Sequence, residues 1–422
     1  MAKKATVKKE GQLPDPFKML QKIDNNVEII EESAYSNIDD WIPSGNYILN
    51  ACVSGSMFRG FAPCGRVTTL SGDPGTAKSY LACSFSREAQ KKGYTVLYLD
   101  SEGAIDKAFV SRLGVDSSKL IIKQVSTVLE VSQTILNLCQ ELEKQDEEYG
   151  EHNKFAIVLD SLGNLTTQSE LDNTASGENK RDLKRAQDVK QLFRTCATPI
   201  ARMKIPLVVV SHVYASIGSY VSTNIVSGGS GLGYNSSVTL ELSVSKLADK
   251  ANDAAASKAA NAEDVVKTGV TVTAKPKKSR FTIPRKVRFQ IPYYKKPNPY
   301  VGLDGFVGDF EKSGICRGVI LTEKEYNKLS DVEKSKAYVF EYNGETKYCQ
   351  QKDTSRSIVV RHLGEAVPIN ELFTEKVFSE EYLHWLDDNV IRPAFELPDQ
   401  NAFDDIKEIE DLIEVGEENS KN

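Results

Sequence analysis

The stretch Val67-Thr-Thr-Leu-Ser-Gly-Asp-Pro-Gly-Thr-Ala-Lys-Ser79 joins a β-branched strand pattern to the start of an apolar helical pattern. The loop between the two patterns contains small residues and ends in a lysine and a hydroxyl residue. Such a loop is typical of phosphate binding, because backbone N–H groups and a helix N-terminus surround an anion. A tight turn with a surface lysine is the simpler alternative, but the flanking strand and helix favour a phosphate-binding loop.

Every residue of this loop is expected to contribute to nucleotide binding. The expected nucleotide-binding residues are Gly72, Asp73, Pro74, Gly75, Thr76, Ala77, Lys78 and Ser79. Lys78 would contact the β- and γ-phosphates, and the Ser79 hydroxyl would reach Mg²⁺. Ala77 replaces the usual glycine, and because alanine adopts a positive φ only at a cost, we expect near-helical backbone geometry there.

The composition is that of a globular protein, with 40% hydrophobic and 27% charged residues in a chain of 422. No apolar run approaches the length of a membrane span, and no apolar segment follows the lysine-rich N-terminus, so we expect neither membrane insertion nor secretion. The seven cysteines are scattered without a Cys-x-x-Cys pair. This spacing favours a reduced, intracellular protein without disulfides or zinc.

The formal charge of −6 is distributed unevenly along the chain. Residues 396–422 contain ten acidic and two basic residues, so this tail carries about −8 and the remainder about +2. The overall acidic balance therefore does not exclude a nucleic-acid partner.

Five further segments have the apolar composition of buried strands, and amphipathic helical patterns separate most of them. These segments are 95–100, 119–125, 155–160, 207–212 and 238–244. The pattern predicts an α/β fold with a mainly parallel sheet covered by helices on both faces. Such sheets bind ligands at the carboxyl ends of their strands.

The chain divides into an arm, a core, a small C-terminal domain and a tail. The expected boundaries are 1–46 for the arm, 47–292 for the core, 293–395 for an α+β domain and 396–422 for the acidic tail. An alanine-rich insertion occupies 248–262 within the core.

Three polar residues lie at or just beyond the ends of predicted strands and are candidates for chemistry at the sheet edge. Asp160 could hold the hydration shell of Mg²⁺, or it could cap a helix. Glu102 could orient an attacking water, or it could be a solvated turn carboxylate. His212 could contact the γ-phosphate, although a histidine at a strand end more often has only a structural role.

Several motifs follow one another in the order and spacing of the RecA-type recombinases, which the chain resembles from about residue 38 to about residue 395. The segments that carry the resemblance are 72–79, 100–106, 112–116, 158–165, 210–214 and 227–231. Within that family, the resemblance is strongest to the UvsX-type recombinases of tailed phages, which also lack the glycine at the position of Ala77.

The resemblance implies a RecA-like P-loop ATPase core that uses ATP and Mg²⁺. It implies that Glu102 activates the attacking water and that Asp106 and Phe109 contact adenine. It also implies that His212 couples the γ-phosphate to DNA.

Lys278 and Arg280 resemble a basic pair that reaches the ATP of a neighbouring subunit. A solvated basic face is the simpler alternative, because many cations surround this pair.

The resemblance further implies that two loops, about 171–181 and about 213–229, hold DNA. The residues expected to bind DNA are Lys180, Arg181, Lys184, Arg185, Tyr214, Tyr220, Gly228 and Gly229. Cations that neutralise phosphates and side chains that stack on bases suit single-stranded DNA. Two ordinary polar surface loops remain the alternative.

The implied function is a DNA-dependent ATPase that forms helical filaments on single-stranded DNA and catalyses homologous pairing and strand exchange. The implied partners are single- and double-stranded DNA, further copies of the chain, recombination mediators and single-strand-binding proteins. The implied location is the cytoplasm of a bacterial host. A ring-forming helicase of the same fold and an ATP-gated protein that only coats single-stranded DNA are the alternatives.

Overall fold

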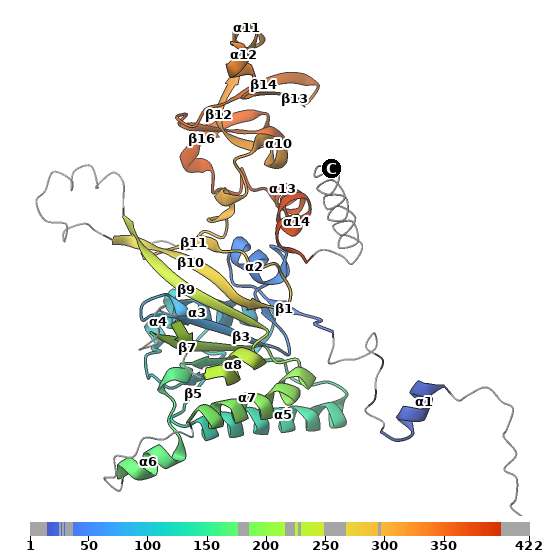
Figure 1. The fold of residues 1–422 in the computed structure, drawn as a ribbon, viewed down its shortest axis with the longest axis vertical. Helices are drawn as coiled ribbons and strands as arrows, with labels where there is room; N and C mark the ends of the chain where they lie inside the picture. Colours follow the sequence, from blue (N-terminus) through green and yellow to red (C-terminus); the bar gives the residue numbers. More distant parts are fainter. Residues whose placement is uncertain are drawn as a thin grey trace, which may run out of the picture.

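A nine-stranded sheet forms the centre of the molecule (Figure 1). The structure is a computed structural model that describes residues 15–24, 27, 29, 37–175, 185–215, 224–226, 229–248, 267–293 and 297–397. The strands of the central sheet are β3 (Val67–Gly72), β4 (Thr95–Asp100), β5 (Leu120–Gln124), β6 (Phe155–Asp160), β7 (Leu207–Ala215), β8 (Asn224–Val226), β9 (Val238–Ala248), β10 (Lys267–Ser279) and β11 (Val287–Pro292).

The strand order is β11-β10-β9-β3-β7-β6-β4-β5, and β8 pairs with the end of β7. Neighbours from β9 to β5 run parallel, whereas β10, β11 and β8 are added antiparallel. The α/β fold with a mainly parallel sheet is therefore confirmed. All five additional strand segments predicted from the sequence are present, and β9 runs four residues beyond its predicted end.

Alternate residues of the central strands serve two separate hydrophobic clusters. In β4, Val96 and Tyr98 belong to the cluster on one face, and Leu97 and Leu99 belong to the cluster on the other. Successive side chains of a strand point to opposite faces of its sheet. An apolar run without polar alternation is therefore the pattern that a sheet covered on both sides requires.

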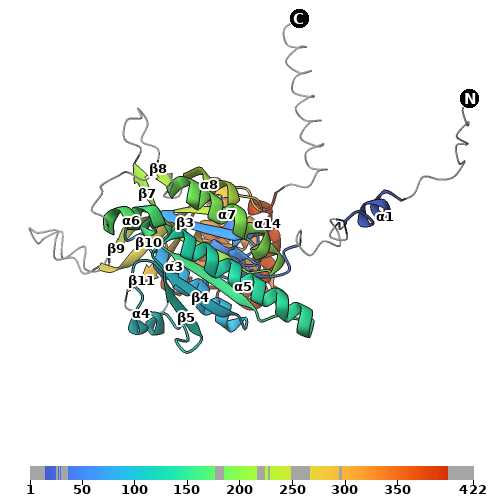
Figure 2. The same ribbon diagram turned by 90° about the horizontal axis from the view of Figure 1, so that it is seen from below.

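Helices cover both faces of the sheet: α5 and α7 lie beneath it in Figure 1, and Figure 2, seen from below, shows them side by side in front of it. The helices of this region are α2 (Tyr47–Ser54), α3 (Lys78–Lys91), α4 (Lys107–Arg112), α5 (Val128–Tyr149), α6 (Gln168–Ala175), α7 (Arg185–Arg202) and α8 (Gly229–Asn235). A capping box between Thr127 and Glu130 begins α5. The short strands β1 (Trp41–Ile42) and β2 (Ala62–Pro63) form a separate pair.

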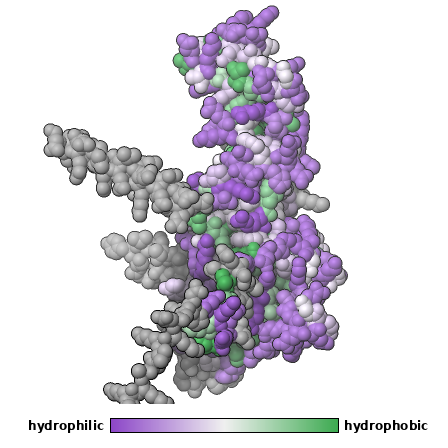
Figure 3. All heavy atoms as spheres, turned by 90° about the vertical axis from the view of Figure 1, so that its right-hand side faces the viewer, coloured by the Kyte–Doolittle hydropathy of each residue, from purple (hydrophilic) through white to green (hydrophobic). Residues whose placement is uncertain are grey.

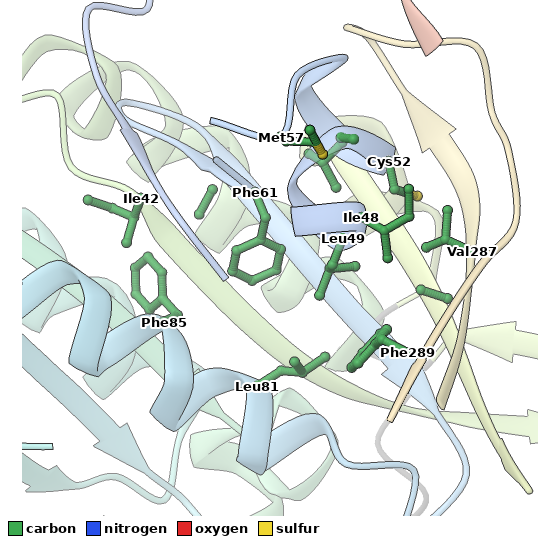
Figure 4. Close-up of a cluster of buried hydrophobic side chains, with 14 of the residues drawn as sticks. Ile42, Ile48, Leu49, Cys52, Met57, Phe61, Leu81, Phe85, Val287 and Phe289 are labelled. Atoms are coloured by element: carbon green, nitrogen blue, oxygen red, sulfur yellow. The ribbon is translucent and has the colours of Figure 1, made fainter. Parts of the chain in front are cut away.

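The face opposite α5 and α7 is held together by a cluster of fully buried side chains (Figure 4). Ile48 and Leu49 of α2 approach Phe289 of β11, while Leu81 and Phe85 extend from α3. Burying one such side chain contributes about 1.5–3 kcal/mol. The packing of α3 in this cluster fixes the loop that precedes the helix at the edge of the sheet.

The C-terminal part contains a five-stranded antiparallel sheet in the order β13-β14-β12-β15-β16. Its strands are β12 (Ile315–Leu321), β13 (Ala337–Tyr342), β14 (Glu345–Gln351), β15 (Ser357–Val360) and β16 (Glu365–Pro368). Its helices are α10 (Phe310–Ser313), α11 (Glu323–Asn327), α12 (Asp331–Lys334), α13 (Glu380–Leu386) and α14 (Arg392–Phe395). Figure 3 shows this part as the upper end of the molecule, with a predominantly hydrophilic surface.

The chain returns from the C-terminal sheet to the core through α13, a π-helical turn (Asp387–Ile391) and α14. Leu386, Ile391 and Phe395 belong to the same hydrophobic cluster as α2. Buried Asp387 accepts hydrogen bonds from the Ser56 hydroxyl at 2.6 Å and the Met57 N–H at 2.7 Å. The junction between the two parts therefore contains both apolar packing and a buried polar contact.

The N-terminal helix α1 (Pro16–Gln21) begins at the Asp15 side chain, which accepts a hydrogen bond from the Phe17 N–H. Met19, Leu20 and Ile23 are exposed, so the described residues do not cover the apolar side chains of this segment. Ala248 pairs with Lys267 at the ends of β9 and β10, so the predicted insertion at 248–262 joins two antiparallel strands. Residues 249–266 and the tail from residue 398 lie outside the described residues. Among the helices that are described, none combines the length and apolarity of a membrane span.

We predict that Asp387→Ala lowers the free energy of unfolding by about 3 kcal/mol, because a buried hydroxyl and a buried N–H lose their acceptor. Urea denaturation measures the loss. Asp388→Ala is the matched control: its carboxylate also pairs with Arg392 but is 63% exposed, so we expect a change below about 0.5 kcal/mol. Equal effects of the two substitutions would contradict the role of Asp387.

Candidate functional site

The predicted phosphate loop lies between β3 and α3, at the carboxyl end of the central strand of the sheet. An added Cβ at Gly72 would lie 2.5 Å from the carbonyl oxygen of Leu242, so only glycine fits against β9 there. The Lys78 ammonium donates hydrogen bonds to the carbonyl oxygens of Gly72 at 2.9 Å and Asp73 at 2.7 Å. Burial lowers the pKa of Lys78, and the charges of Asp160 and Glu102 oppose that shift.

The expectation for the backbone of Ala77 was wrong. Ala77 has φ 68° and ψ 22°, in the left-handed region, and directly precedes α3. A non-glycine residue in this region costs about 1–2 kcal/mol. The loop must turn sharply enough to bring Lys78 and Ser79 back toward its centre, and this tertiary requirement outweighs the local preference of alanine.

Glu102 and Ser161, which follow β4 and β6, come together with His212 of β7. The Ser161 hydroxyl donates to Glu102 Oε1 at 2.6 Å, and His212 Nε2 lies 3.1 Å from the same oxygen. Burial alone would raise the pKa of Glu102, but these two hydrogen bonds and the charges of His212 and Lys78 hold it below its usual value. Glu102 is therefore a carboxylate at neutral pH.

Asp100 shapes the turn that presents Glu102. Its Oδ1 accepts the backbone N–H groups of Glu102 at 3.0 Å and Gly103 at 2.9 Å. The β4–β6 register pairs Asp100 with Asp160, which brings the two strand ends level at the sheet edge. The Glu102 turn and Asp160 therefore share one edge of the sheet.

Asp160 has the environment expected of a residue that supports a bound cation. It is 4% exposed, and its Oδ2 accepts a hydrogen bond from the Tyr98 hydroxyl at 2.7 Å. Its Oδ1 is enclosed and has no hydrogen-bond partner among the described residues. Burial raises the pKa of Asp160, and the charges of Glu102 and Asp100 add to the shift, whereas Tyr98 and Ser79 oppose it.

These observations fit Mg²⁺ at this position. A buried carboxylate oxygen without a partner is costly unless a cation or a polar group approaches it. The residues that would hold the ion and its waters are Ser79 and Asp160, both of which line the same cavity. Within the described part of the chain, no group of three or more His, Cys, Asp or Glu residues could hold a metal ion by itself.

The phosphate loop, Glu102, Asp160 and His212 line one cavity of about 450 Å³. Phe109, Ile291 and Tyr293 also line this cavity and give it an apolar and aromatic wall. Asp106 caps α4 by accepting the Phe109 N–H at 2.8 Å, so it lies beside Phe109 without lining the cavity itself. This arrangement suits a nucleotide with its base at Phe109.

Lys278 and Arg280 do not line the cavity of their own chain. Lys278 pairs with Thr239, near the start of β9, whereas Gly72 pairs with Leu242 further along that strand. The Lys278 ammonium donates to the carbonyl oxygens of Gly233 and Tyr234 at 2.8 and 3.0 Å. Lys278 and Arg280 therefore lie toward the end of the strands that is opposite to the phosphate loop of the same chain.

The residues expected to bind DNA are only partly described. The residues outside the described chain are Lys180, Arg181, Lys184, Tyr220 and Gly228. Tyr214 lies in β7 and Gly229 begins α8. Arg185 donates hydrogen bonds to the carbonyl oxygens of Leu162, Gly163 and Leu165, so its guanidinium also holds the turn after β6. DNA binding by these residues stays a prediction.

The two segments expected to be loops contain regular structure at their ends. Helix α6 extends through Ala175, inside the first segment. The second segment begins in β7, whose residues Val213–Ala215 pair with Asn224–Val226 of β8. β-branched residues at 213, 225 and 226 favour this strand pairing.

Sequence reasoning did not identify Ser161, Tyr98 or Tyr293. Ser161 directly follows β6, and Tyr293 directly follows β11. Their position just after a strand is the signal that identified Glu102 as a candidate, and it could have identified them too. Tyr98 lies inside an apolar run, and its contact with Asp160 depends on the pairing of β4 with β6. Only the tertiary structure reveals that contact.

A family model described as "RecA N-terminal domain" matches residues 22–283. "Protein RecA" of Nautilia profundicola is 27% identical over 214 residues, which cover 50% of this chain and 57% of that protein. "Protein RecA" of Methylobacterium radiotolerans is 29% identical over 196 residues, which cover 45% of this chain and 50% of that protein. The chain spans about half the length of the curated relatives it matches.

We predict that Tyr98→Phe raises the Mg²⁺ concentration needed for half-maximal ADP binding about tenfold, because Asp160 loses the hydrogen bond that orients it. A Mg²⁺ titration of ADP binding by calorimetry measures this shift without requiring turnover.

Tyr94→Phe is the control, since Tyr94 is also a buried tyrosine that donates to a carboxylate, in its case Asp40 at 2.9 Å. It should leave the Mg²⁺ dependence of ADP binding unchanged. An unchanged Mg²⁺ dependence in Tyr98→Phe would show that Asp160 does not need this contact.

Proposed function

Because this chain belongs to the RecA family, we propose that it is a DNA-dependent ATPase that assembles on single-stranded DNA and catalyses homologous pairing and strand exchange. The observation that carries this proposal is the convergence of Lys78, Glu102 and His212 in one cavity. Lys78 is a cation that would bind phosphate, and Glu102 is a carboxylate that would orient water. His212 precedes a candidate DNA-binding segment.

In the proposed hydrolysis, the phosphate loop and Lys78 hold the β- and γ-phosphates of ATP. Glu102 orients the attacking water, since its lowered pKa keeps it ionised and able to accept a hydrogen bond from that water. Ser161 fixes the position of Glu102 through the 2.6 Å hydrogen bond. Mg²⁺, when bound, would neutralise charge that develops on the phosphate oxygens.

His212 connects the proposed ATPase site to DNA binding. It lies at the end of the parallel part of β7, three residues before that strand ends at Ala215. Its Nε2 contacts Glu102, whereas the chain that follows it forms the β7–β8 pair. A γ-phosphate that changes the contacts of His212 would therefore also act on the segment around 216–223, which the resemblance assigns to DNA.

Assembly into filaments has support from exposed apolar side chains. β5 is an edge strand of the central sheet, and its Ile121 and Ile122 are 49% and 46% exposed. An exposed edge strand presents unpaired backbone groups to another chain. The exposed apolar residues near α1 provide a segment that could cover such a surface on a neighbouring copy, while Lys278 and Arg280 would approach the ATP of a neighbour.

The remaining proposals follow from the family and from charge. The proposed partners are single- and double-stranded DNA, mediator proteins and single-strand-binding proteins, in the cytoplasm of a phage-infected bacterium. The acidic tail at 396–422 would compete with DNA for the same cations, because it carries about −8.

The test of this function is a joint-molecule assay with homologous single-stranded and duplex DNA, with and without ATP. We expect joint molecules only with ATP, and extended filaments by electron microscopy. Lys78→Ala should lose both, because the phosphates lose their cation. ATP hydrolysis without joint molecules would refute strand exchange, and closed rings on single strands would favour the helicase.

We predict that Glu102→Gln lowers DNA-stimulated ATP hydrolysis at least about 100-fold, because the amide orients water poorly and accepts no proton. Binding of ATP and DNA should persist, so filaments should accumulate. Phosphate release measures hydrolysis, and filter binding measures DNA retention. Glu141→Gln, an exposed change on α5, is the control. Wild-type turnover in Glu102→Gln would exclude the proposed role.

A further inference from the structure

A second cavity, of about 830 Å³, adjoins the nucleotide cavity. The residues that line both cavities are Tyr80, Arg112, Leu113, Pro292 and Tyr293. None of these residues belongs to the phosphate loop at 72–79 or to the group formed by Glu102, Ser161 and His212. The second cavity therefore opens from the part of the nucleotide cavity that would hold the base.

The wall of the second cavity carries more positive than negative charge. Arg87 and Lys91 of α3 both pair with the same carboxylate oxygen of Glu88, each at 2.8 Å. Arg112 adds a third cation to the lining of this cavity. The lining thus contains three cations and one carboxylate, so the cavity favours an anionic group.

Tyr80 provides a polar group at the junction of the two cavities. Its hydroxyl is enclosed and has no hydrogen-bond partner in the part of the chain that the structure describes. A ligand atom that accepts a hydrogen bond from this hydroxyl would relieve the cost of an unsatisfied buried donor.

Aromatic side chains line another part of the second cavity. Tyr47 and Phe58 contact each other edge to face, with ring centroids 5.7 Å apart. An uncharged linker can pack against such a surface, because apolar contact there removes both partners from water. The cavity therefore combines space and an apolar wall for a linker with cations for its end.

We propose that the base end of the nucleotide site is open and that the second cavity receives an anionic substituent on the base of an adenine nucleotide. This inference rests on the proposed function, because it places the base at Phe109 and the phosphates at Lys78. The ligand class is an adenine nucleotide that carries a carboxylate on its exocyclic amine. A site closed around the base would reject such a ligand by steric overlap.

The test compares ADP, N6-propyl-ADP and N6-(2-carboxyethyl)-ADP by calorimetry on the full chain without DNA. Both substituted nucleotides should bind within about tenfold of ADP, because the cavity has room for either substituent. The carboxylate should bind about threefold more tightly than the propyl group, because it gains a screened interaction with the cations.

Lys91→Glu tests the charge. Lys91 lines the second cavity but not the nucleotide cavity. This substitution should abolish or reverse the preference for the carboxylate over the propyl group. Lys144→Glu, an equal charge change at an exposed position of α5, should leave that preference intact.

The outcomes separate this inference from the proposed function. If ADP itself fails to bind, the nucleotide site is wrong and the proposed function fails. If ADP binds but both substituted nucleotides bind more than about 100-fold more weakly, the base end is closed and only this inference is overturned. If the preference survives Lys91→Glu, the cations do not select the substituent, and the proposed ligand class is wrong.

Discussion

The parallel register of β3, β4, β6 and β7 is the constraint on which the candidate site depends. Gly72 pairs with His212, and Asp100 pairs with Asp160, so four strand ends meet at one edge of the sheet. Parallel strands release their following loops at the same edge. The phosphate loop, the Glu102 turn, Asp160 and His212 therefore converge although up to 140 residues separate them along the chain.

This convergence creates an electrostatic problem that a bound nucleotide and cation would resolve. Lys78 and Asp160 are both buried. Burial lowers the pKa of Lys78 and raises the pKa of Asp160, so it favours the neutral form of each side chain. Tyr98 satisfies one oxygen of Asp160, while the other has no partner among the described residues. The Lys78 ammonium meanwhile donates hydrogen bonds to backbone carbonyl oxygens of its own loop. A site with such groups is prepared for phosphates and a divalent ion.

The C-terminal part is joined to this core by a continuous series of contacts. Buried Asp387 fixes the segment after α2, and α2 packs in turn on β11 and α3. The same α3 begins at Lys78 and carries Arg87 and Lys91 into the second cavity. One hydrophobic cluster thus packs the C-terminal part against the core and also positions α3, which carries the phosphate loop at its start and residues of the second cavity along its length.

The sequence by itself determined the sheet, the phosphate loop and the strand-end residues Glu102, Asp160 and His212, because local periodicity and turn chemistry are written in consecutive residues. It did not determine the positive φ of Ala77, the contact of Tyr98 with Asp160 or the cavity beyond Tyr80. Each of these depends on residues that are distant in the chain and adjacent only after strand pairing and helix packing. Local preference is worth about 1 kcal/mol per residue, and tertiary packing outweighs it wherever the two conflict.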